Sequence, residues 1–263
     1  MDDAAGRQWP DTPVGSAGAG RWRITVVEET ASTNADLLAS AATGAAEGEV
    51  LVAQFQSGGR GRLDRSWVSP AGAGLTFSVL LRPRLPASAW GWLPLVTGLA
   101  LVGAVGGDAR LKWPNDLLLG PEAGKAAGIL AQTAGGAAVI GVGLNVGTAR
   151  EELPVESATS LLLAGHTELD RPVLLGRFLD RFGDLYDAWQ HGDAAVAAAY
   201  RAVCATIGSL VSVQLADRVV LGEAVGVDDN GQLTLQTAGG SPLRVAAGDV
   251  THVRAATAPG SLP

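Results

Sequence analysis

Arginine and glycine alternate in a short segment of this chain, QSGGRGRLDRSW, which spans residues 56–67. Guanidinium groups bind phosphate and carboxylate through paired hydrogen bonds, and glycines let the backbone close around a ligand. The apolar run EVLVAQF precedes the segment, so Arg60, Arg62 and Arg65 follow a buried strand. The segment lacks the spacing of a Walker A loop and of a Rossmann fingerprint. The residue types indicate an anion-binding turn, with a solvated loop as the alternative.

Two further segments place polar side chains at the start of an element. STN, residues 32–34, lies where a helix begins, and the free N–H groups there are capped by a side chain or bind an anion or a carbonyl oxygen. KWPND, residues 112–116, presents Asn115 and Asp116 directly after a proline. An asparagine can read an adenine edge, and a carboxylate can hold Mg²⁺ or a ribose. An ordinary asparagine–aspartate turn is the alternative.

The glycine-rich segments GKAAGIL and GVGLNV complete the set. Lys125 opens the first, and Gly128, Gly141 and Gly143 remove side-chain volume from the facing strands, so that a flat ligand can lie against them. A glycine-rich hairpin of no special purpose is the alternative. The chain has 17 arginines and only two lysines, Lys112 and Lys125. A lysine in such a chain indicates a compact point charge that a guanidinium cannot supply.

Hydrophobic patterns predict the elements that position these residues. A helix is expected to begin at Ser32 or Thr33, where Thr33 and Asp36 have the spacing of a capping box. The other expected elements are strands at residues 21–29, 49–56 and 75–83, an apolar helix at 88–106, two short strands around Pro114, a hairpin at 125–146 that turns at Gly135–Gly136, and helical periodicity over 171–204. The main domain is therefore predicted to be mixed α+β.

The pattern changes after residue 208. Residues 209–254 alternate apolar and polar side chains in short runs without a helical period, which predicts a small barrel-like β domain. Asn230–Gly231 has the composition of a type I′ turn. We expect a disordered tail at residues 1–20, a main domain at 21–206 and the β domain at 207–256.

Composition excludes several classes of protein. With 263 residues, 47% hydrophobic and 17% charged, the chain is globular. The single cysteine, Cys204, rules out an intrachain disulfide, and the three histidines have no metal-site spacing. The net charge of −7 argues against broad nucleic-acid binding. The N-terminus lacks an apolar signal segment, and the apolar run 92–107 is short for a membrane span. We expect a cytoplasmic protein.

The motifs together resemble the biotin protein ligases. QSGGRGRLDRSW, STN, KWPND, GKAAGIL and GVGLNV occur in the order and approximate spacing of that family, and ATSL, residues 158–161, resembles a segment that follows the hairpin. The resemblance covers about residues 22–254. It implies a mixed-sheet, class II synthetase-like catalytic domain with an SH3-like C-terminal barrel, in the short class without the N-terminal DNA-binding domain of the repressor-type enzymes.

The resemblance implies a two-step reaction. Biotin's carboxylate attacks the α-phosphate of ATP to form biotinyl-5′-AMP and pyrophosphate, and a lysine of biotin carboxyl carrier protein then takes the biotin and releases AMP. The substrates are biotin and ATP with Mg²⁺, and no tightly bound cofactor is implied. The expected partner is the apo carrier domain, with no DNA and no membrane, and the enzyme is a monomer or a homodimer.

The resemblance also assigns residues. Lys125 and Arg62 would be catalytic. Biotin contacts would come from Ser32, Thr33, Asn34, Gln56, Gly59, Arg60, Gly61, Arg62, Lys125, Gly128, Gly141 and Gly143. ATP contacts would come from Arg62, Arg65, Trp67, Asn115, Asp116, Asn145 and Arg254, with Asp116 also the candidate Mg²⁺ ligand.

One position departs from the family pattern. Asp64 stands where many members have glycine, and it adds a negative charge to a loop expected to bind anions. We expect Asp64 to pair with Arg65 and to pre-form the loop.

Three other functions remain as alternatives. A lipoate–protein ligase-like acyl ligase would differ in its acyl substrate. A non-catalytic sensor of biotin or its adenylate is disfavoured by the net charge of −7. A carrier-binding adaptor would lack adenylation.

Overall fold

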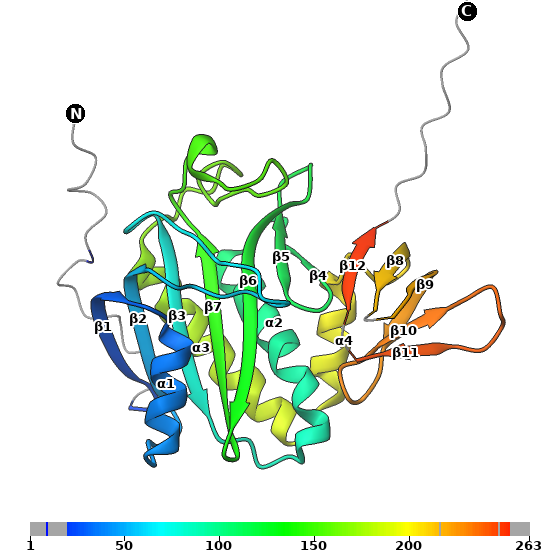
Figure 1. The fold of residues 1–263 in the computed structure, drawn as a ribbon, viewed down its shortest axis with the longest axis horizontal. Helices are drawn as coiled ribbons and strands as arrows, with labels where there is room; N and C mark the ends of the chain where they lie inside the picture. Colours follow the sequence, from blue (N-terminus) through cyan, green and yellow to red (C-terminus); the bar gives the residue numbers. More distant parts are fainter. Residues whose placement is uncertain (1–8, 10–19, 216, 247, 253–263) are drawn as a thin grey trace, which may run out of the picture.

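A seven-stranded mixed sheet organises most of the chain (Figure 1). The computed structural model describes Trp9 and residues 20–215, 217–246 and 248–252. The strand order is β1-β2-β3-β7-β6-β5-β4. The strands are β1 (Arg23–Thr30), β2 (Glu49–Gln56), β3 (Gly74–Leu81), β4 (Arg110–Lys112), β5 (Asp116–Leu119), β6 (Gly124–Ala134) and β7 (Ala137–Asn145). This arrangement confirms the expected α+β class.

The strand pairs of this sheet differ in direction. β1 and β2, which helix α1 (Thr33–Ala42) connects, are parallel, and the remaining pairs are antiparallel. The β6–β7 hairpin turns at the predicted place, since Ala134 pairs with Ala137. Gly135 and Gly136 have φ of 56° and 77°, which only glycine adopts readily and which a two-residue type I′ turn requires.

Helices cover the two faces of the sheet differently. Helix α1 lies on one face, and α2 and α3 lie behind the other (Figure 1). The helical elements besides α1 are the 3₁₀ helix η2 (Ala87–Trp92), α2 (Leu93–Val105), α3 (Arg171–Gln190), α4 (Ala194–Val203) and a short 3₁₀ helix, η3 (Arg150–Glu152), which follows β7. The helical periodicity expected over 171–204 is divided in two, because Gly192 turns left-handed at φ 72° and Asp193 caps α4.

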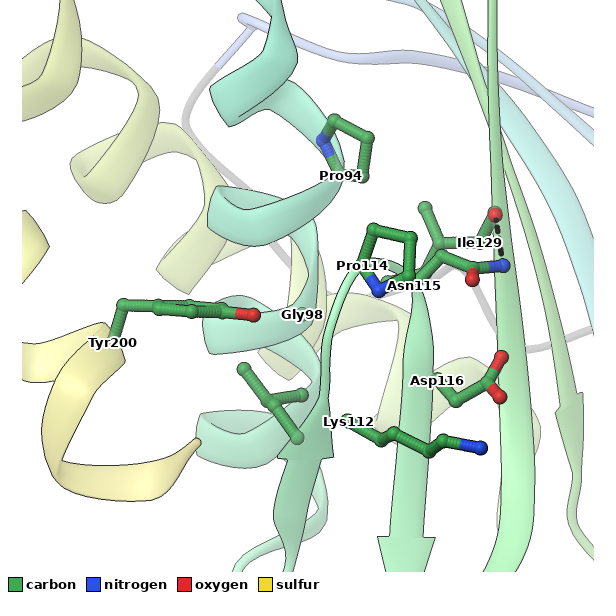
Figure 2. Close-up of a pocket in the computed structure, with 9 residues that line it drawn as sticks. Pro94, Gly98, Lys112, Pro114, Asn115, Asp116, Ile129 and Tyr200 are labelled. Carbon is green, nitrogen blue, oxygen red and sulfur yellow. Dashed lines mark hydrogen bonds between the residues drawn. The ribbon is translucent and has the colours of Figure 1, made fainter. Parts of the chain in front are cut away.

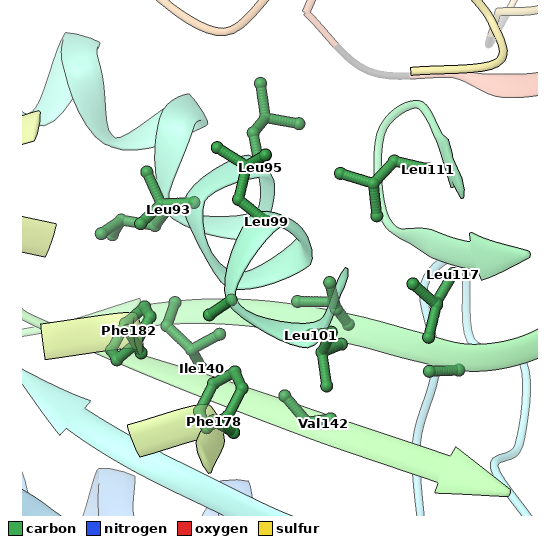
Figure 3. Close-up of a cluster of buried hydrophobic side chains, with 14 of the residues drawn as sticks. Leu93, Leu95, Leu99, Leu101, Leu111, Leu117, Ile140, Val142, Phe178 and Phe182 are labelled. Atoms are coloured by element: carbon green, nitrogen blue, oxygen red, sulfur yellow. The ribbon is translucent and has the colours of Figure 1, made fainter. Parts of the chain in front are cut away.

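Helix α2 lies at the centre of the hydrophobic core. Figure 3 shows Leu101 of α2 beside Ile140 and Val142 of β7, with Phe178 and Phe182 of α3 next to them. The continuous segment Ala87–Val105 is long and apolar enough to cross a membrane by length and composition alone. Burial between α3 and the sheet accounts for that apolar character, since a helix enclosed by protein is hydrophobic on all sides.

A second sheet follows the first. It is five-stranded and antiparallel, in the order β11-β10-β9-β8-β12. The strands are β8 (Leu210–Gln214), β9 (Val219–Val227), β10 (Leu233–Gln236), β11 (Leu243–Val245) and β12 (Asp249–His252). The domain boundary at residues 206 and 207 stays a prediction, and the expected tail, apart from Trp9 and Gly20, lies outside the described residues.

The turn between β9 and β10 docks the second sheet on the first. The indole N–H of Trp92 donates to the Asp228 carbonyl at 3.0 Å, and that of Trp113 donates to the Gly231 carbonyl at 3.0 Å. The predicted type I′ turn is wrong, because Gly231 is left-handed at φ 77° and Asn230 is not. The Asp228 carboxylate accepts the N–H of Asn230 at 2.9 Å, which holds a longer turn instead.

The contact between Gly91 and the β9–β10 turn is so close that adding one methyl group should disrupt it. A Cβ at Gly91 would lie 2.2 Å from the Asn230 carbonyl oxygen, whereas a Cβ at Gly226 would meet nothing within 4 Å. We expect Gly91→Ala to separate the two sheets and to lower the thermal midpoint by several degrees, as a loss of about 1–3 kcal/mol does. Gly226→Ala is the control. Scanning calorimetry checks this, and equal midpoints for the two variants would contradict the docking role.

Candidate functional site

One row of residues crosses the sheet on the face opposite helix α2. Lys112 pairs with Asp116, Asp116 with Gly128, Gly128 with Gly143, and Gly143 with Thr76. Directly opposed residues in an antiparallel ladder point to the same face, so these five positions form one continuous floor. The neighbouring positions on the strands are apolar and buried against the helices. The sheet therefore packs the core with one face and presents polar groups and glycines on the other.

A polar cluster lies at the α1 end of this floor. The side-chain oxygen Oε1 of Gln56 accepts a hydrogen bond from the backbone N–H of Thr33 at 2.8 Å and another from the Thr33 hydroxyl at 3.0 Å. Ser78 bonds the Thr33 hydroxyl at 2.7 Å and donates to the Asn34 side-chain oxygen at 2.6 Å. The Asn34 amide donates to Gln132 at 2.8 Å. The structure thus brings the predicted residues Thr33, Asn34 and Gln56 together, and these bonds orient their amide and hydroxyl groups.

Ser32 has a local role in this cluster. It is the N-cap of α1, and its hydroxyl accepts from the Ala35 N–H at 3.4 Å. The expected capping box of Thr33 and Asp36 is wrong, because the Thr33 hydroxyl is engaged with Gln56 and Ser78. The Asp36 carboxylate instead accepts from the Thr30 hydroxyl.

Side chains from other segments cover the glycines on this face of the sheet. A Cβ at Gly141 would lie 2.3 Å from the Asn34 side-chain oxygen, and one at Gly143 would lie 2.2 Å from Cε2 of Trp67. A Cβ at Gly128 would lie 3.2 Å from the same indole. The flat group on Gly128 and Gly143 is therefore Trp67, and Asn34 covers Gly141. Nε1 of Trp67 is buried and has no hydrogen-bond partner among the described residues.

The arginine–glycine segment forms a hairpin-like loop over the floor. Gly59 accepts the Trp67 N–H at 2.9 Å, and Arg60 pairs with Ser66 in an antiparallel bridge. A Cβ at Gly59 would lie 2.4 Å from the Trp67 carbonyl oxygen, so glycine is required there. The Gly61 N–H donates to the Arg65 carbonyl at 2.6 Å. Figure 1 shows the segment after β2 crossing in front of β7 and β6.

Arg62 connects the loop to two other segments. Its guanidinium donates to the Asn115 side-chain oxygen at 3.2 Å and to the Gly248 carbonyl at 3.4 Å. Burial lowers the pKa of Arg62, against the opposing effect of the nearby Asp116 carboxylate. Both acceptors are neutral, so the positive charge of Arg62 stays available to an anion.

The expected pairing of Asp64 with Arg65 is wrong. Arg65 forms an ion pair with Asp249 of β12, and this contact lowers the pKa of the Asp249 carboxyl. Leu63 and Asp64 form the tip of the loop with φ of 55° and 57°. A left-handed conformation suits glycine, and aspartate tolerates it better than most residues. Asp64 therefore replaces glycine at a position that needs a left-handed backbone, and Arg65 extends toward β12.

The second cationic residue of the site, Lys125, pairs with Asp116. The Lys125 ammonium lies 2.7 Å from Oδ1 of Asp116, with the two side chains 38% and 17% exposed. The Lys125 N–H donates to the Ser157 carbonyl at 2.8 Å, and the Thr159 N–H donates to the Lys125 carbonyl at 2.9 Å. The segment that contains ATSL thus fixes the backbone of Lys125, and the ion pair fixes its ammonium.

The other two asparagines of the predicted site donate hydrogen bonds to backbone carbonyls. The Asn115 amide donates to the Ile129 carbonyl at 3.0 Å while its oxygen accepts from Arg62. Asn145 is buried and donates to the Thr159 carbonyl at 2.9 Å, so it supports the segment behind Lys125. Arg254 lies outside the described residues.

Asp116 is also the place to consider for a metal. No group of three potential ligands among His, Cys, Asp and Glu occurs in the described part of the chain. Mg²⁺ is often held by one or two carboxylates together with substrate phosphates, so a single carboxylate fits an ion that arrives with a phosphate ligand. The donor set does not fit a resident metal.

A crevice behind the β4–β5 turn borders this floor, since Lys112 and Asp116 are among its lining residues. Figure 2 shows it between α2 and the turn, with Pro94, Gly98 and Tyr200 on the α2 side. It has no room for a water molecule. The Asp116 and Lys112 side chains point away from α2, toward the polar face of the sheet.

Three residues of the site were not predicted from sequence. Ser78 and Gln132 complete the polar cluster, and Asp249 holds Arg65. A wholly buried serine inside the apolar run LTFSVLL is a signal that could have identified Ser78. No comparable local signal marks Asp249, because its partner is 184 residues away.

Comparison with known proteins agrees with this geometry. The profile of the biotin/lipoate A/B protein ligase family matches residues 26–148, and that of the biotin protein ligase C terminal domain matches residues 206–253. The chain is 44% identical to the biotin–[acetyl-CoA-carboxylase] ligase of Mycobacterium tuberculosis, over 90% of this chain and 92% of that protein. The chain belongs to the biotin protein ligase family.

Other members show the same relationship. The biotin–[acetyl-CoA-carboxylase] ligase of Paracoccus denitrificans is 33% identical, and the alignment covers 84% of this chain and 98% of the relative. The biotin protein ligase of Aquifex aeolicus in complex with biotin and ATP superimposes with a TM-score of 0.74 at 27% identity, covering 89% of this chain and 99% of the other.

The contact between Trp67 and the floor can be tested directly. We expect Gly143→Ala to displace the indole and to expose the loop, because its Cβ has no space, whereas a Cβ at Gly147 would have its nearest neighbour at 3.9 Å. Limited trypsin digestion at Arg60, Arg62 and Arg65 should then accelerate several-fold in Gly143→Ala and stay unchanged in Gly147→Ala. Equal cleavage of both variants would show that Trp67 does not hold the loop.

Proposed function

We propose that this biotin protein ligase activates biotin with ATP to form biotinyl-5′-AMP and then transfers biotin to a lysine of a biotin carboxyl carrier protein. The observation that supports it most is the placement of Arg62 and the Lys125–Asp116 pair on the polar floor, beside the cluster of Thr33, Asn34 and Ser78. A polar cluster at one end and two cations further along match a ligand with a hydrogen-bonding head and a reacting carboxylate at its tail.

The first step needs two anions to approach each other. A carboxylate oxygen of biotin forms a bond to the α-phosphorus of ATP, the bond from that phosphorus to the bridging oxygen breaks, and the electron pair leaves with pyrophosphate. No proton transfer is required, so catalysis consists of positioning and charge neutralisation. Lys125 would neutralise the reacting oxygens, and Asp116 would hold its ammonium in place. Arg62, desolvated and bonded only to neutral acceptors, would neutralise the phosphate.

In the second step the carrier's lysine amine attacks the acyl carbon of the mixed anhydride, and AMP leaves. Water competes with the amine for the same carbon. The indole of Trp67 covers Gly128 and Gly143 on the floor, and a covered site excludes water from a reactive anhydride. The arginine–glycine loop therefore would act as the lid that Trp67 anchors.

The polar cluster favours biotin over lipoate as the acyl substrate. Biotin's ureido ring carries a carbonyl and two N–H groups, which Thr33, Asn34, Ser78 and Gln56 can satisfy. Lipoate's disulfide ring has no such groups and would gain no hydrogen bonds from this cluster, so it would bind less tightly than biotin.

The proposal also includes the substrates, the residues at each end of the site and the acceptor. Biotin and Mg²⁺–ATP are substrates, and Asp116 is the candidate carboxylate for the ion. Ser32, Gly59, Arg60 and Gly61 shape the biotin end, and Arg65, Trp67, Asn115, Asn145 and Arg254 the nucleotide end. The acceptor is an apo carrier domain in the cytoplasm. Arg65 and Arg62 reach Asp249 and Gly248, so the second sheet would close over the nucleotide.

Exchange of pyrophosphate into ATP tests the proposal. We expect biotin, and not lipoate, to drive the exchange, and label from biotin to appear on an apo carrier domain afterwards. Lys125→Ala should lower the exchange rate by a factor of about 10² or more while the thermal midpoint stays near that of the parent, because one charged contact to the reacting atoms is lost. Glu122→Ala, at an exposed position in the preceding loop, is the control. Full exchange in Lys125→Ala would refute the catalytic role.

A further inference from the structure

Lys112, the first residue of KWPND, has no role among those described so far, yet it lies in the row that forms the floor. It pairs directly with Asp116 across β4 and β5. Figure 2 shows the two side chains extending together, away from α2. Asp116 in turn holds Lys125 at 2.7 Å. One carboxylate therefore has a lysine strand-neighbour on one side and a paired lysine on the other.

The Lys112 ammonium has no ion pair or hydrogen bond with any residue in the described part of the chain, whereas Lys125 is paired with Asp116 and Arg65 with Asp249. Its charge nevertheless reaches the second sheet. It contributes to the lowered pKa of Asp249, after the larger effect of Arg65, and to the lowered pKa of His252, after the larger effect of burial. Lys112 is thus a positive charge held between Asp116 and β12.

The charges of this region do not balance. Arg62, Lys112 and Lys125 are three cations, and Asp116 is the carboxylate that faces them, because Asp249 is engaged by Arg65. Burying like charges together is unfavourable unless an anion joins them. The whole chain carries −7, so this local excess is specific to the site. The first step brings three anionic groups into this region: the reacting carboxylate, the α-phosphate and the pyrophosphate that leaves.

We infer that Lys112 binds the β- and γ-phosphates of ATP and stabilises the pyrophosphate as it leaves. This inference rests on the proposed function, which assigns Lys125 and Arg62 to the carboxylate and the α-phosphate. Lys112 is one strand beyond Asp116, and neighbouring strands are about 4.8 Å apart. A triphosphate that continues from Lys125 past Asp116 therefore meets Lys112 next. Negative charge grows on the leaving group as the bond to the α-phosphorus breaks, so this cation acts mainly in the transition state.

The two half-reactions separate this role from a structural one. Pyrophosphate takes part in adenylate formation and its reversal, and it is absent from the transfer of biotin to the carrier. We expect Lys112→Gln to slow adenylate formation at least about tenfold and to raise the KM for pyrophosphate in the reverse direction. Transfer from chemically prepared biotinyl-5′-AMP to the apo carrier domain should change less than about twofold.

Two further variants act as controls. Lys112→Arg keeps the charge and should recover part of the lost rate, because a guanidinium also binds phosphate. Arg110→Gln removes an exposed charge from the same strand and should leave both half-reactions unchanged. Circular dichroism melting confirms that each variant is folded.

Three outcomes would contradict the inference. Normal exchange kinetics in Lys112→Gln would refute it. Equal losses in both half-reactions would show that Lys112 merely positions Asp116 and Lys125. Absence of biotin-dependent exchange in the parent protein would instead refute the proposed function, and this inference with it.

Discussion

The site depends on three glycines on one face of a sheet, where the lack of a side chain lets other groups approach the backbone. Gly128 and Gly143 are register partners, and Gly141 is two residues further along β7. The opposite face of the same strands carries Ile129, Val142 and their neighbours into the core. Alternation along a strand makes both possible at once, because successive residues point to opposite faces. One face can therefore be closely packed, while the other has no side chains at these positions, so that a ring can lie against the backbone.

Close contacts on this glycine face then determine the positions of the arginine–glycine loop and of the polar cluster. Asn34 lies over Gly141 and Trp67 over Gly143, and each contact leaves no room for a methyl group. Trp67 fixes the base of the arginine–glycine loop, and the loop carries Arg62 to Asn115 and to the second sheet. The backbone of the motif is thus held by packing, while its cations stay in reach of ligand oxygens.

Electrostatic preorganisation is the second feature of the arrangement. Asp116 pairs with Lys125 and Asp249 pairs with Arg65, whereas Arg62 donates only to neutral acceptors. The pairs are partly exposed and contribute little to overall stability. Their value lies in holding charge in place before the substrates arrive, since a fixed charge needs no reorganisation during the reaction. Because Asp249 belongs to β12, the second sheet takes part in this arrangement.

Local sequence determined much of this protein. Short-range patterns were sufficient for the Gly135–Gly136 hairpin, the helix that begins near Ser32 and Thr33, the α+β class and the motifs that resemble the biotin protein ligases, because turn geometry, capping and strand alternation depend on residues a few positions apart. The tertiary structure alone decided which partner each polar group takes. Asp249 rather than Asp64 binds Arg65, Ser78 rather than a capping box engages Thr33, and Asp228 shapes the turn at Asn230. The Arg65 and Thr33 partners lie on strands distant in the chain, and the alignment of four strands gives Lys112, Asp116, Gly128 and Gly143 a common floor. Register is set by the packing of the whole sheet, and no single segment of the sequence contains it.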